Sequence, residues 1–328
     1  MTERVKQEMT QFSMWQKPLE GVGYKVAQPL PLTWSLNDDG KSPRLLILCL
    51  VHGNEVGGLA VVNEILRLLA GGYIRAEIPL LFVLANPDAA VKGQRFLQEN
   101  LNRCFGLKVP KGVESQRAIA IGSLFRPTDY MVDLHQTSGP SDRSFFIFPF
   151  SPRPVRFASG VDPSKTMVTH WGPSFSKEGA CSDEYLNSLG GCGITLELGQ
   201  MGFDPYQVND GVAGILRALF LVSRLARKET HPDLSDLHGL HAGELYTFAH
   251  VEEVASGVKS VALVPGWQNF SNIKQGDLVG RIDGMERHCQ QNGKIMFPFY
   301  ANPHLPYSVP KEAWRILKPL AWNELPWK

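Results

Sequence analysis

A histidine and a glutamate with two residues between them follow the first strongly apolar segment of this 328-residue sequence. The segment, RLLILCLV over residues 44–51, is short and continuous, as expected of a strand covered on both faces. His52 and Glu55 come directly after it, and in an open α/β sheet the loop after a strand is where ligands bind. An imidazole and a carboxylate in that loop suit Zn²⁺. The alternative is a helix-capping loop in which the helix dipole favours Glu55.

His135 is the best placed third ligand for such a zinc site among the nine histidines of the chain. It ends the apolar segment 130–134, so we expect it to emerge at the same edge of the sheet as the HGNE loop. Asp133 shares its strand face and could orient the imidazole, or it could cap the strand end. The pair His238 and His241 has no carboxylate or strand end nearby, so we expect both side chains to face solvent and bind no metal.

Glu197 interrupts the apolar sequence GITLEL over residues 193–198. A strand interior would bury this carboxylate, which is costly unless it has a task or a partner. Near a metal site it could act as general base and then as general acid. The alternative is a structural glutamate held in an ion pair.

The segment 86–106 carries three further candidates, Arg95, Asn102 and Arg103. A guanidinium on a loop can polarise a carbonyl or bind a carboxylate through two parallel hydrogen bonds. A single arginine on a loop is more often simply solvated. The small and polar neighbours of these residues, in a loop that follows a predicted strand, leave binding and simple solvation equally open.

These candidates need elements to position them, and the sequence predicts an α/β sheet flanked by helices. Apolar strand-like segments alternate with helical periodicity, which is typical of a mostly parallel sheet. Asp210 is expected to cap the last of these helices, which runs through Arg227. The predicted strands span 44–51, 79–85, 130–134, 145–150 and 193–198, and the predicted helices span 55–69, 115–125 and 210–227.

After Arg227 the pattern changes to a polar linker and then to short strand-like pieces separated by turns. Gly and Asn-Gly turns without helical periodicity predict a second, small all-β domain. We therefore expect an α/β catalytic domain over 1–235 and a β-rich domain over 236–328. The predicted strands of the second domain span 244–251, 258–264, 277–282 and 294–299.

Composition excludes several classes of protein. Lys and Arg total 33 against 32 Asp and Glu, so no basic surface for nucleic acid or an anionic membrane is expected. No run of eighteen apolar residues predicts a membrane span, and the polar start fits neither a secretory signal nor a transit peptide. Five sparse cysteines favour a reducing cytoplasm over a disulfide scaffold. The sequence leaves homo-oligomerisation open.

Four motifs in this order resemble the succinylglutamate desuccinylase/aspartoacylase family, a branch of the zinc carboxypeptidase superfamily. The resemblance spans roughly residues 45–206, about half the chain. It implies a zinc-carboxypeptidase-like mixed sheet, with the small β domain covering the active site. The motifs are HGNE at 52–55, the loop from Asn86 to Arg103 with its GQRF and NLNR sequences, DLH at 133–135, and TLELG at 195–199.

Carried over by residue, the resemblance implies one zinc ion per chain and a set of site residues around it. His52, Glu55 and His135 would bind the zinc. Glu197 would be the general base and acid. The remaining roles would be polarisation of the scissile carbonyl by Arg95, binding of a substrate carboxylate by Asn102 and Arg103, and contact from a C-terminal tyrosine, for which Tyr307 is preferred to Tyr300.

The reaction implied is hydrolysis of an N-acyl amino acid by zinc-activated water, with N-succinylglutamate, giving succinate and glutamate, as the first choice. A deacetylase of another N-acyl amino acid or of a diamine, a metallocarboxypeptidase, and a catalytically silent metal-binding protein are the alternatives. After DLH the sequence departs from the desuccinylase pattern, and Arg143 is expected to replace a displaced carboxylate-binding arginine.

Overall fold

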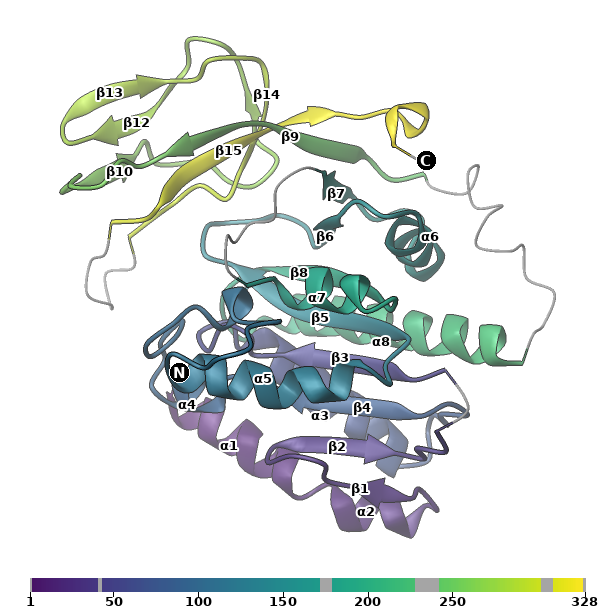
Figure 1. Cartoon of the computed structure of the whole chain (residues 1–328). Coiled ribbons are helices and arrows are strands. Elements are labelled where there is room, and N and C mark those ends of the chain that lie inside the picture. The colour runs from purple at the N-terminus through teal and green to yellow at the C-terminus, as the bar shows by residue number, and fades with distance from the viewer. Residues whose placement is uncertain (1, 41–42, 172–178, 228–241, 302–308, 327–328) are drawn as a thin grey trace.

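The computed structural model of the chain describes residues 2–40, 43–171, 179–227, 242–301 and 309–326 (Figure 1). Within these residues, twelve strands form one mixed sheet in the order β1-β2-β4-β3-β5-β8-β6-β7-β9-β15-β14-β11, and three form a small antiparallel sheet in the order β10-β12-β13. The strands are β1 Val26–Ala27, β2 Thr33–Leu36, β3 Leu45–Cys49, β4 Leu80–Leu84, β5 Tyr130–Thr137, β6 Phe145–Pro149, β7 Met167–His170, β8 Cys192–Gln200, β9 Leu245–Glu253, β10 Val261–Leu263, β11 Asn272–Ile273, β12 Leu278–Ile282, β13 Met285–His288, β14 Gly293–Met296 and β15 Glu312–Pro319.

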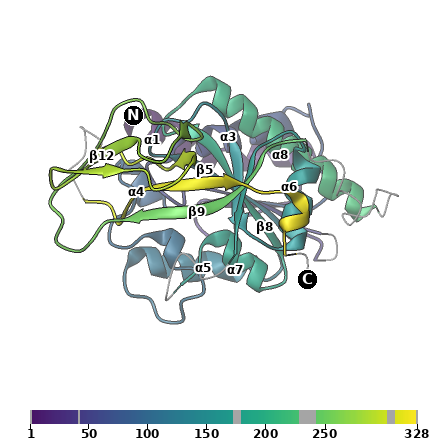
Figure 2. The ribbon, with the colours of Figure 1, turned by 90° about the horizontal axis from the view of Figure 1, so that it is seen from above.

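Helices cover both faces of the large sheet (Figure 2). Leu45 and Ile47 of β3 pack in the cluster that contains the buried sides of α3 and α8, whereas Leu46 and Leu48 pack against α5 and α7. A strand covered on both faces is apolar at every position, which explains the unbroken run of β3. The helices are α1 Thr2–Ser13, α2 Gln16–Gly21, α3 Gly57–Ala70, α4 Pro87–Val91, α5 Val113–Phe125, α6 Pro152–Val161, α7 Ser182–Ser188 and α8 Pro205–Ala226, with short 3-10 helices η1 Leu101–Arg103 and η3 Trp322–Glu324.

The predicted α/β class is confirmed, and two predicted boundaries are wrong. Helix α8 begins at Pro205, and the side chain of Asp204 accepts the amides of Tyr206 and Gln207. Asp204 rather than Asp210 therefore caps this helix, because proline suits a first helical position and carries no amide to satisfy. Strand β5 also continues past its apolar part to Thr137, since it pairs with β8 through His135 and beyond.

The parallel pairing of β3, β5 and β8 brings the candidate residues to one edge of the sheet. Cys49 lies opposite Leu134, and His135 lies opposite Glu197 on the next strand. The HGNE loop therefore leaves β3 beside the end of β5. This is the carboxyl edge at which the sequence analysis places the site.

The C-terminal strands continue the hydrogen bonding of the large sheet. Met167 and Val168 of β7 pair in parallel with Leu245 and Tyr246 of β9, and β15, β14 and β11 follow. Figure 1 shows β9 and β15 beyond β7, at the top of the view. The region is β-rich as predicted, with β11, β13 and β15 in addition to the predicted strands. The boundary between residues 235 and 236 lies outside the described residues and stays a prediction.

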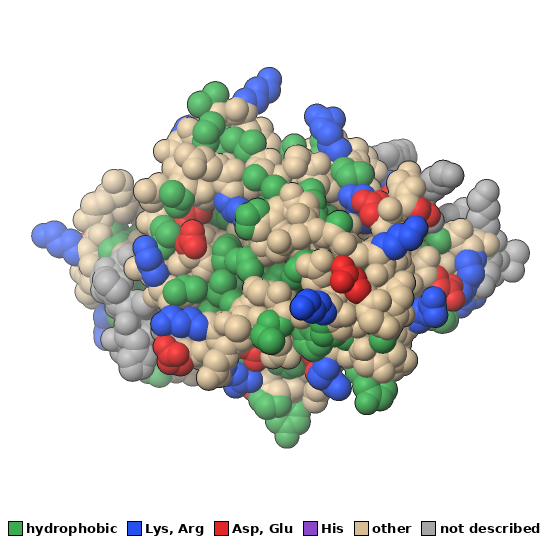
Figure 3. All heavy atoms as spheres, turned by 90° about the horizontal axis from the view of Figure 1, so that it is seen from below, with side chains coloured by type: hydrophobic (Ala, Val, Ile, Leu, Met, Phe, Trp, Pro, Cys, Tyr) green, Lys and Arg blue, Asp and Glu red, His purple; other side chains and the backbone are tan. Residues whose placement is uncertain are grey.

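The surface agrees with the balanced composition. On the face shown in Figure 3, basic and acidic side chains are interspersed. Among the described residues, no helix combines the length and apolar character needed to cross a membrane.

The HGNE loop packs directly on the backbone of α4. A Cβ added at Gly53 would lie 2.4 Å from the amide nitrogen of Ala90 and 2.5 Å from the carbonyl carbon of Ala89. Backbone cannot move aside as a side chain can, so only glycine fits this position.

We therefore expect Gly53→Ala to lower the free energy of unfolding by about 1–3 kcal/mol through overpacking. Gly21→Ala is the matched control, because a Cβ there meets nothing within 4 Å. Urea unfolding of both variants and the wild type measures the difference. Equal stability of the two variants would contradict the packing at Gly53.

Candidate metal centre and active site

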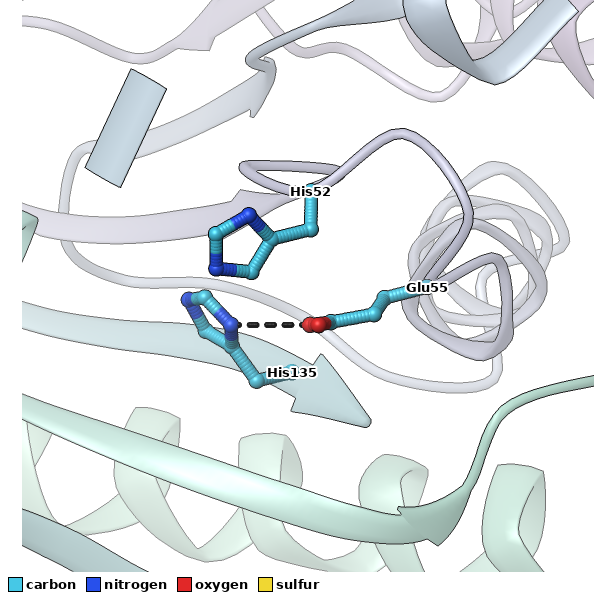
Figure 4. Close-up of side chains that lie close together, drawn as sticks. All are labelled: His52, Glu55 and His135. Carbon is cyan, nitrogen blue, oxygen red and sulfur yellow. Dashed lines mark hydrogen bonds and ion pairs between the residues drawn. The ribbon is translucent and has the colours of Figure 1, made fainter. Parts of the chain in front are cut away.

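His52, Glu55 and His135 form a compact buried cluster at the carboxyl edge of the sheet (Figure 4). His52 lies in the turn after β3, Glu55 lies just before α3, and His135 lies in β5. One potential ligand atom of each residue lies within 4.8 Å of those of the other two. Among the described residues this is the set of His, Cys, Asp and Glu side chains that could hold a metal ion.

The carboxylate of Glu55 is fixed through both of its oxygens. Oε1 accepts from the Arg95 guanidinium at 2.7 Å, and Oε2 lies 2.9 Å from Nδ1 of His135 and accepts the Gln136 amide at 3.1 Å. Burial raises the pKa of Glu55, but Arg95 and His135 outweigh it and hold the pKa below its usual value. Glu55 is therefore ionised, as a metal ligand must be.

Asp133 contacts the other nitrogen of the His135 ring. Its Oδ2 lies 3.0 Å from Nε2, and the side chain is fully buried. Burial lowers the pKa of His135, but Asp133 and Glu55 outweigh it and raise that pKa well above its usual value. Of the two roles open from the sequence, Asp133 thus contacts the imidazole, as the carboxylates behind metal-binding histidines commonly do.

His52 completes the cluster as an unprotonated imidazole. Its ring centroid lies 5.2 Å from that of His135, with the two planes at 75°. Burial, followed by the charges of Arg95, His135 and Arg103, holds the pKa of His52 well below its usual value. Nδ1 of His52 is buried without a hydrogen-bond partner among the described residues. A neutral imidazole with an unpaired nitrogen, beside a carboxylate and a second imidazole, fits zinc.

Glu197 lies opposite His135 on β8 and is buried. Burial raises its pKa to about 8, with the neighbouring His135 acting in the opposite direction. Its Oε2 has no hydrogen-bond partner among the described residues. A carboxyl group with a pKa near neutrality can both take up and release a proton. The alternative from the sequence, a structural glutamate held in an ion pair, would place a cationic partner at this oxygen, and none of the described residues fills that place.

Of the predicted loop residues, Arg95 and Arg103 act on this cluster, and Asn102 contacts the start of α7. Arg95 is 39% exposed on its side chain while it binds Glu55. Asn102 Oδ1 accepts the backbone amide of Ser182 at 3.0 Å. Arg103 donates to the carbonyl oxygen of Asn102 at 2.6 Å and to Sγ of Cys181 at 3.1 Å, and its charge acts on His52.

Arg143 lies in a different environment. It binds Asp142 at 3.2 Å and Glu244 at 2.9 Å, and its guanidinium lies 5.5 Å from the ring centroid of Phe270. These contacts tie the loop after β5 to the C-terminal strands, and the role of Arg143 in substrate binding stays a prediction. Tyr307 lies outside the described residues, as do His238 and His241. The hydroxyl of Tyr300 donates to the carbonyl of Trp267 at 3.0 Å.

Two buried residues at the site escaped the sequence analysis. Gln136 accepts the amide of Gly57 at 2.7 Å through Oε1 and donates through Nε2 to the carbonyl of Gly202 at 2.9 Å. Ser182 donates its hydroxyl to Asp133. Gln136 directly follows the predicted ligand His135 in the chain, and this position could have marked it as part of the site. Ser182 lies 49 residues from Asp133, so nothing local marks it.

A buried His, Glu and His set with a carboxyl group opposite it is typical of metal-dependent hydrolases. Residues 41–221 match the model of the succinylglutamate desuccinylase/aspartoacylase catalytic domain, which is more than half of the chain. The chain belongs to the succinylglutamate desuccinylase/aspartoacylase family, and the predicted resemblance is confirmed.

Individual relatives carry the name succinylglutamate desuccinylase. The protein of Shewanella sp. (strain W3-18-1) is 26% identical over 313 residues, covering 88% of this chain and 84% of that protein. For the Vibrio parahaemolyticus protein, 27% identity extends over 139 residues, which is 38% of this chain and 40% of that protein.

Solved structures share the fold. The succinylglutamate desuccinylase of Chromobacterium violaceum superposes with a TM-score of 0.66 at 23% identity, covering 93% of this chain and 97% of that one. Murine aminoacylase 3 gives a TM-score of 0.61 at 17% identity, covering 85% and 95%. At 23% and 17% identity, these structural similarities show that the chain shares the fold of the two proteins.

Asp183 lies at the start of α7, and its burial should make the stability of the protein depend on pH. Burial raises its pKa to about 7 from the usual 3.8, and its Oδ2 accepts the hydroxyl of Thr195 at 3.1 Å. The folded state therefore keeps a proton that the unfolded state loses near pH 4, so this residue lowers stability as the pH rises from about 4 to about 7.

We expect Asp183→Asn to remove this part of the pH dependence. Urea unfolding of the metal-free wild type and variant, at several pH values between about 4 and 8, measures the difference. The variant should gain stability over the wild type as the pH rises. Asp88→Asn, at an exposed position, serves as the control. Parallel profiles for Asp183→Asn and the wild type would contradict the burial of this carboxyl group.

Proposed function

We propose that the protein is a zinc-dependent hydrolase that cleaves the amide bond of an N-acyl amino acid, with N-succinylglutamate as the first candidate. The observation that carries the proposal is the buried cluster of His52, Glu55 and His135, whose ligand atoms lie within 4.8 Å of one another. The family match and the names of the relatives support the same reaction class.

In the proposed site, one zinc ion is held by His52, Glu55 and His135. Zinc supplies a Lewis acid that acidifies water and polarises a carbonyl oxygen. The described residues around the three ligands support this set. Glu55 is held ionised by Arg95, and Asp133 orients the ring of His135.

Glu197 moves the proton in the proposed reaction. Its unpaired Oε2 accepts the proton of the attacking water and then delivers it to the nitrogen of the departing amine. Burial raises the pKa of Glu197 to about 8 in the metal-free protein, which favours the proton-donating half of this cycle. The amino acid departs as the C–N bond breaks, and the acyl group, now bonded to the water oxygen, is released as a short carboxylate.

The basic residues of the loop counter the negative charge of the substrate and of the reacting carbonyl. Arg95 stabilises the oxyanion, because its guanidinium reaches Glu55 and remains partly exposed. Asn102 and Arg103 hold a substrate carboxylate. Contact between Asn102 and Ser182 and between Arg103 and Cys181 fixes this part of the loop before substrate arrives.

The function is tested by amine release from a panel of substrates. The panel contains N-succinylglutamate, N-acetylaspartate, other N-acetyl amino acids, an N-acetylated diamine and a dipeptide with a free C-terminus. We expect zinc-loaded protein to cleave an N-acyl amino acid and chelator-treated protein to lose this activity, with recovery on adding zinc. Cleavage of the dipeptide alone would favour a carboxypeptidase, and zinc-loaded protein that cleaves nothing would contradict the proposal.

The role of Glu197 gives a separate prediction. Glu197→Gln keeps the shape of the side chain and cannot accept the proton, so we expect turnover to fall by about 10²–10⁴-fold. The zinc content should stay at the wild-type value, since Glu197 is not a ligand in the proposal. Glu286→Gln, at an exposed position in β13, is the control. Near wild-type turnover of Glu197→Gln would exclude Glu197 as the base.

A further inference from the structure

The segment before α7 runs directly against the loop that carries Asn102 and Arg103. The amide of Ala180 donates to the carbonyl of Phe105 at 2.9 Å, and a Cβ added at Gly179 would lie 2.1 Å from the carbonyl oxygen of Arg103. The two backbones therefore approach as closely as glycine permits. The first residues of α7 are brought between the loop and β5.

Ser182 is the residue at which these parts meet. Its backbone amide donates to Oδ1 of Asn102 at 3.0 Å, and its hydroxyl donates to Oδ2 of Asp133. The same Oδ2 lies 3.0 Å from Nε2 of His135. Ser182 is fully buried, so no solvent competes for either hydrogen bond.

The neighbours of Ser182 hold it in place. Asp183 accepts the hydroxyl of Thr195 on β8, and the amide of Cys181 donates to the side chain of Glu184 at 2.9 Å. The start of α7 is thus attached both to the sheet and to its own first turn. The fixed backbone keeps the Ser182 hydroxyl within reach of Asp133.

Asp133 depends on that hydroxyl. Its Oδ1 has no hydrogen-bond partner among the described residues, so Oδ2 carries the contacts with both Ser182 and His135. Without the hydroxyl, the carboxylate would lose a charge-assisted hydrogen bond and would be free to rotate away from the imidazole.

We infer that Ser182 is a positioning residue for the metal centre, which holds Asp133 against His135 and at the same time fixes Asn102 of the substrate loop. The inference rests on the proposed function. The two hydrogen bonds of Ser182 can be tested separately, because Ser182→Ala removes the hydroxyl and keeps the backbone amide. The contact with Asn102 therefore survives the substitution, and the contact with Asp133 does not.

The experiment measures zinc affinity by competition with a chromogenic chelator. We expect Ser182→Ala to weaken zinc binding by about 10-fold, the low end of the range for residues behind a metal ligand. Turnover should fall while KM for the cleaved substrate stays near the wild-type value. Ser188→Ala, at the exposed end of the same helix, should leave both unchanged.

A double-mutant cycle separates positioning from packing. In an Asp133→Ala background, Ser182 has no carboxylate to hold, so adding Ser182→Ala should weaken zinc binding no further. Ser182→Cys, which keeps a side chain of similar size with a weak donor, should behave like Ser182→Ala. It provides the same test if the alanine variant does not fold.

Wild-type zinc affinity in Ser182→Ala or Ser182→Cys, or an equal loss with and without Asp133, would overturn the inference and leave the proposed function standing. A wild-type protein that binds no zinc would overturn the proposed function, and with it this inference.

Discussion

The site depends on the burial of one ionised carboxylate, that of Glu55. A buried carboxylate is costly unless charges and hydrogen bonds replace the water it loses. Here Arg95 binds one oxygen, while His135 and the backbone amide of Gln136 contact the other. These contacts outweigh the effect of burial and hold the carboxylate ionised and fixed, which is the state in which it can bind a metal ion.

The sheet supplies the geometry that this arrangement needs. Parallel pairing of β3, β5 and β8 brings the HGNE loop, His135 and Glu197 to one edge, and the alternation within β5 turns Asp133 to the same face as His135. The loop can reach this position because Gly53 packs on the backbone of α4. Small departures in any of these elements would separate the ligand atoms.

Much of this could be predicted from the sequence, because the signals were local. The apolar run of β3, the HGNE motif after it and the lone carboxylate of Glu197 in an apolar strand all lie within a few residues of the positions they mark. The predicted edge for His135 is correct for the same reason, although β5 extends past it. The predicted cap of α8 at Asp210 is wrong, because Pro205 already occupies the first position of the helix and Asp204 caps it.

Contacts between segments that lie far apart in the chain could not be predicted from the sequence. Ser182 and Asp133 meet because α7 packs on β5, and Arg143 pairs with Glu244 across 101 residues. The continuation of the large sheet from β7 into β9 is likewise a pairing that no local pattern announces. Hydrogen bonding between strands depends on which edges meet, whereas periodicity reports only that strands exist.

The central claim is that two imidazoles and one carboxylate bind a zinc ion. Zinc K-edge X-ray absorption of the zinc-loaded protein tests it directly, because the chain also carries five free cysteines that could compete for the metal. The account predicts a shell of nitrogen and oxygen at about 2.0–2.2 Å with imidazole scattering beyond it. A sulfur ligand at about 2.3 Å, or a spectrum without imidazole, would contradict it.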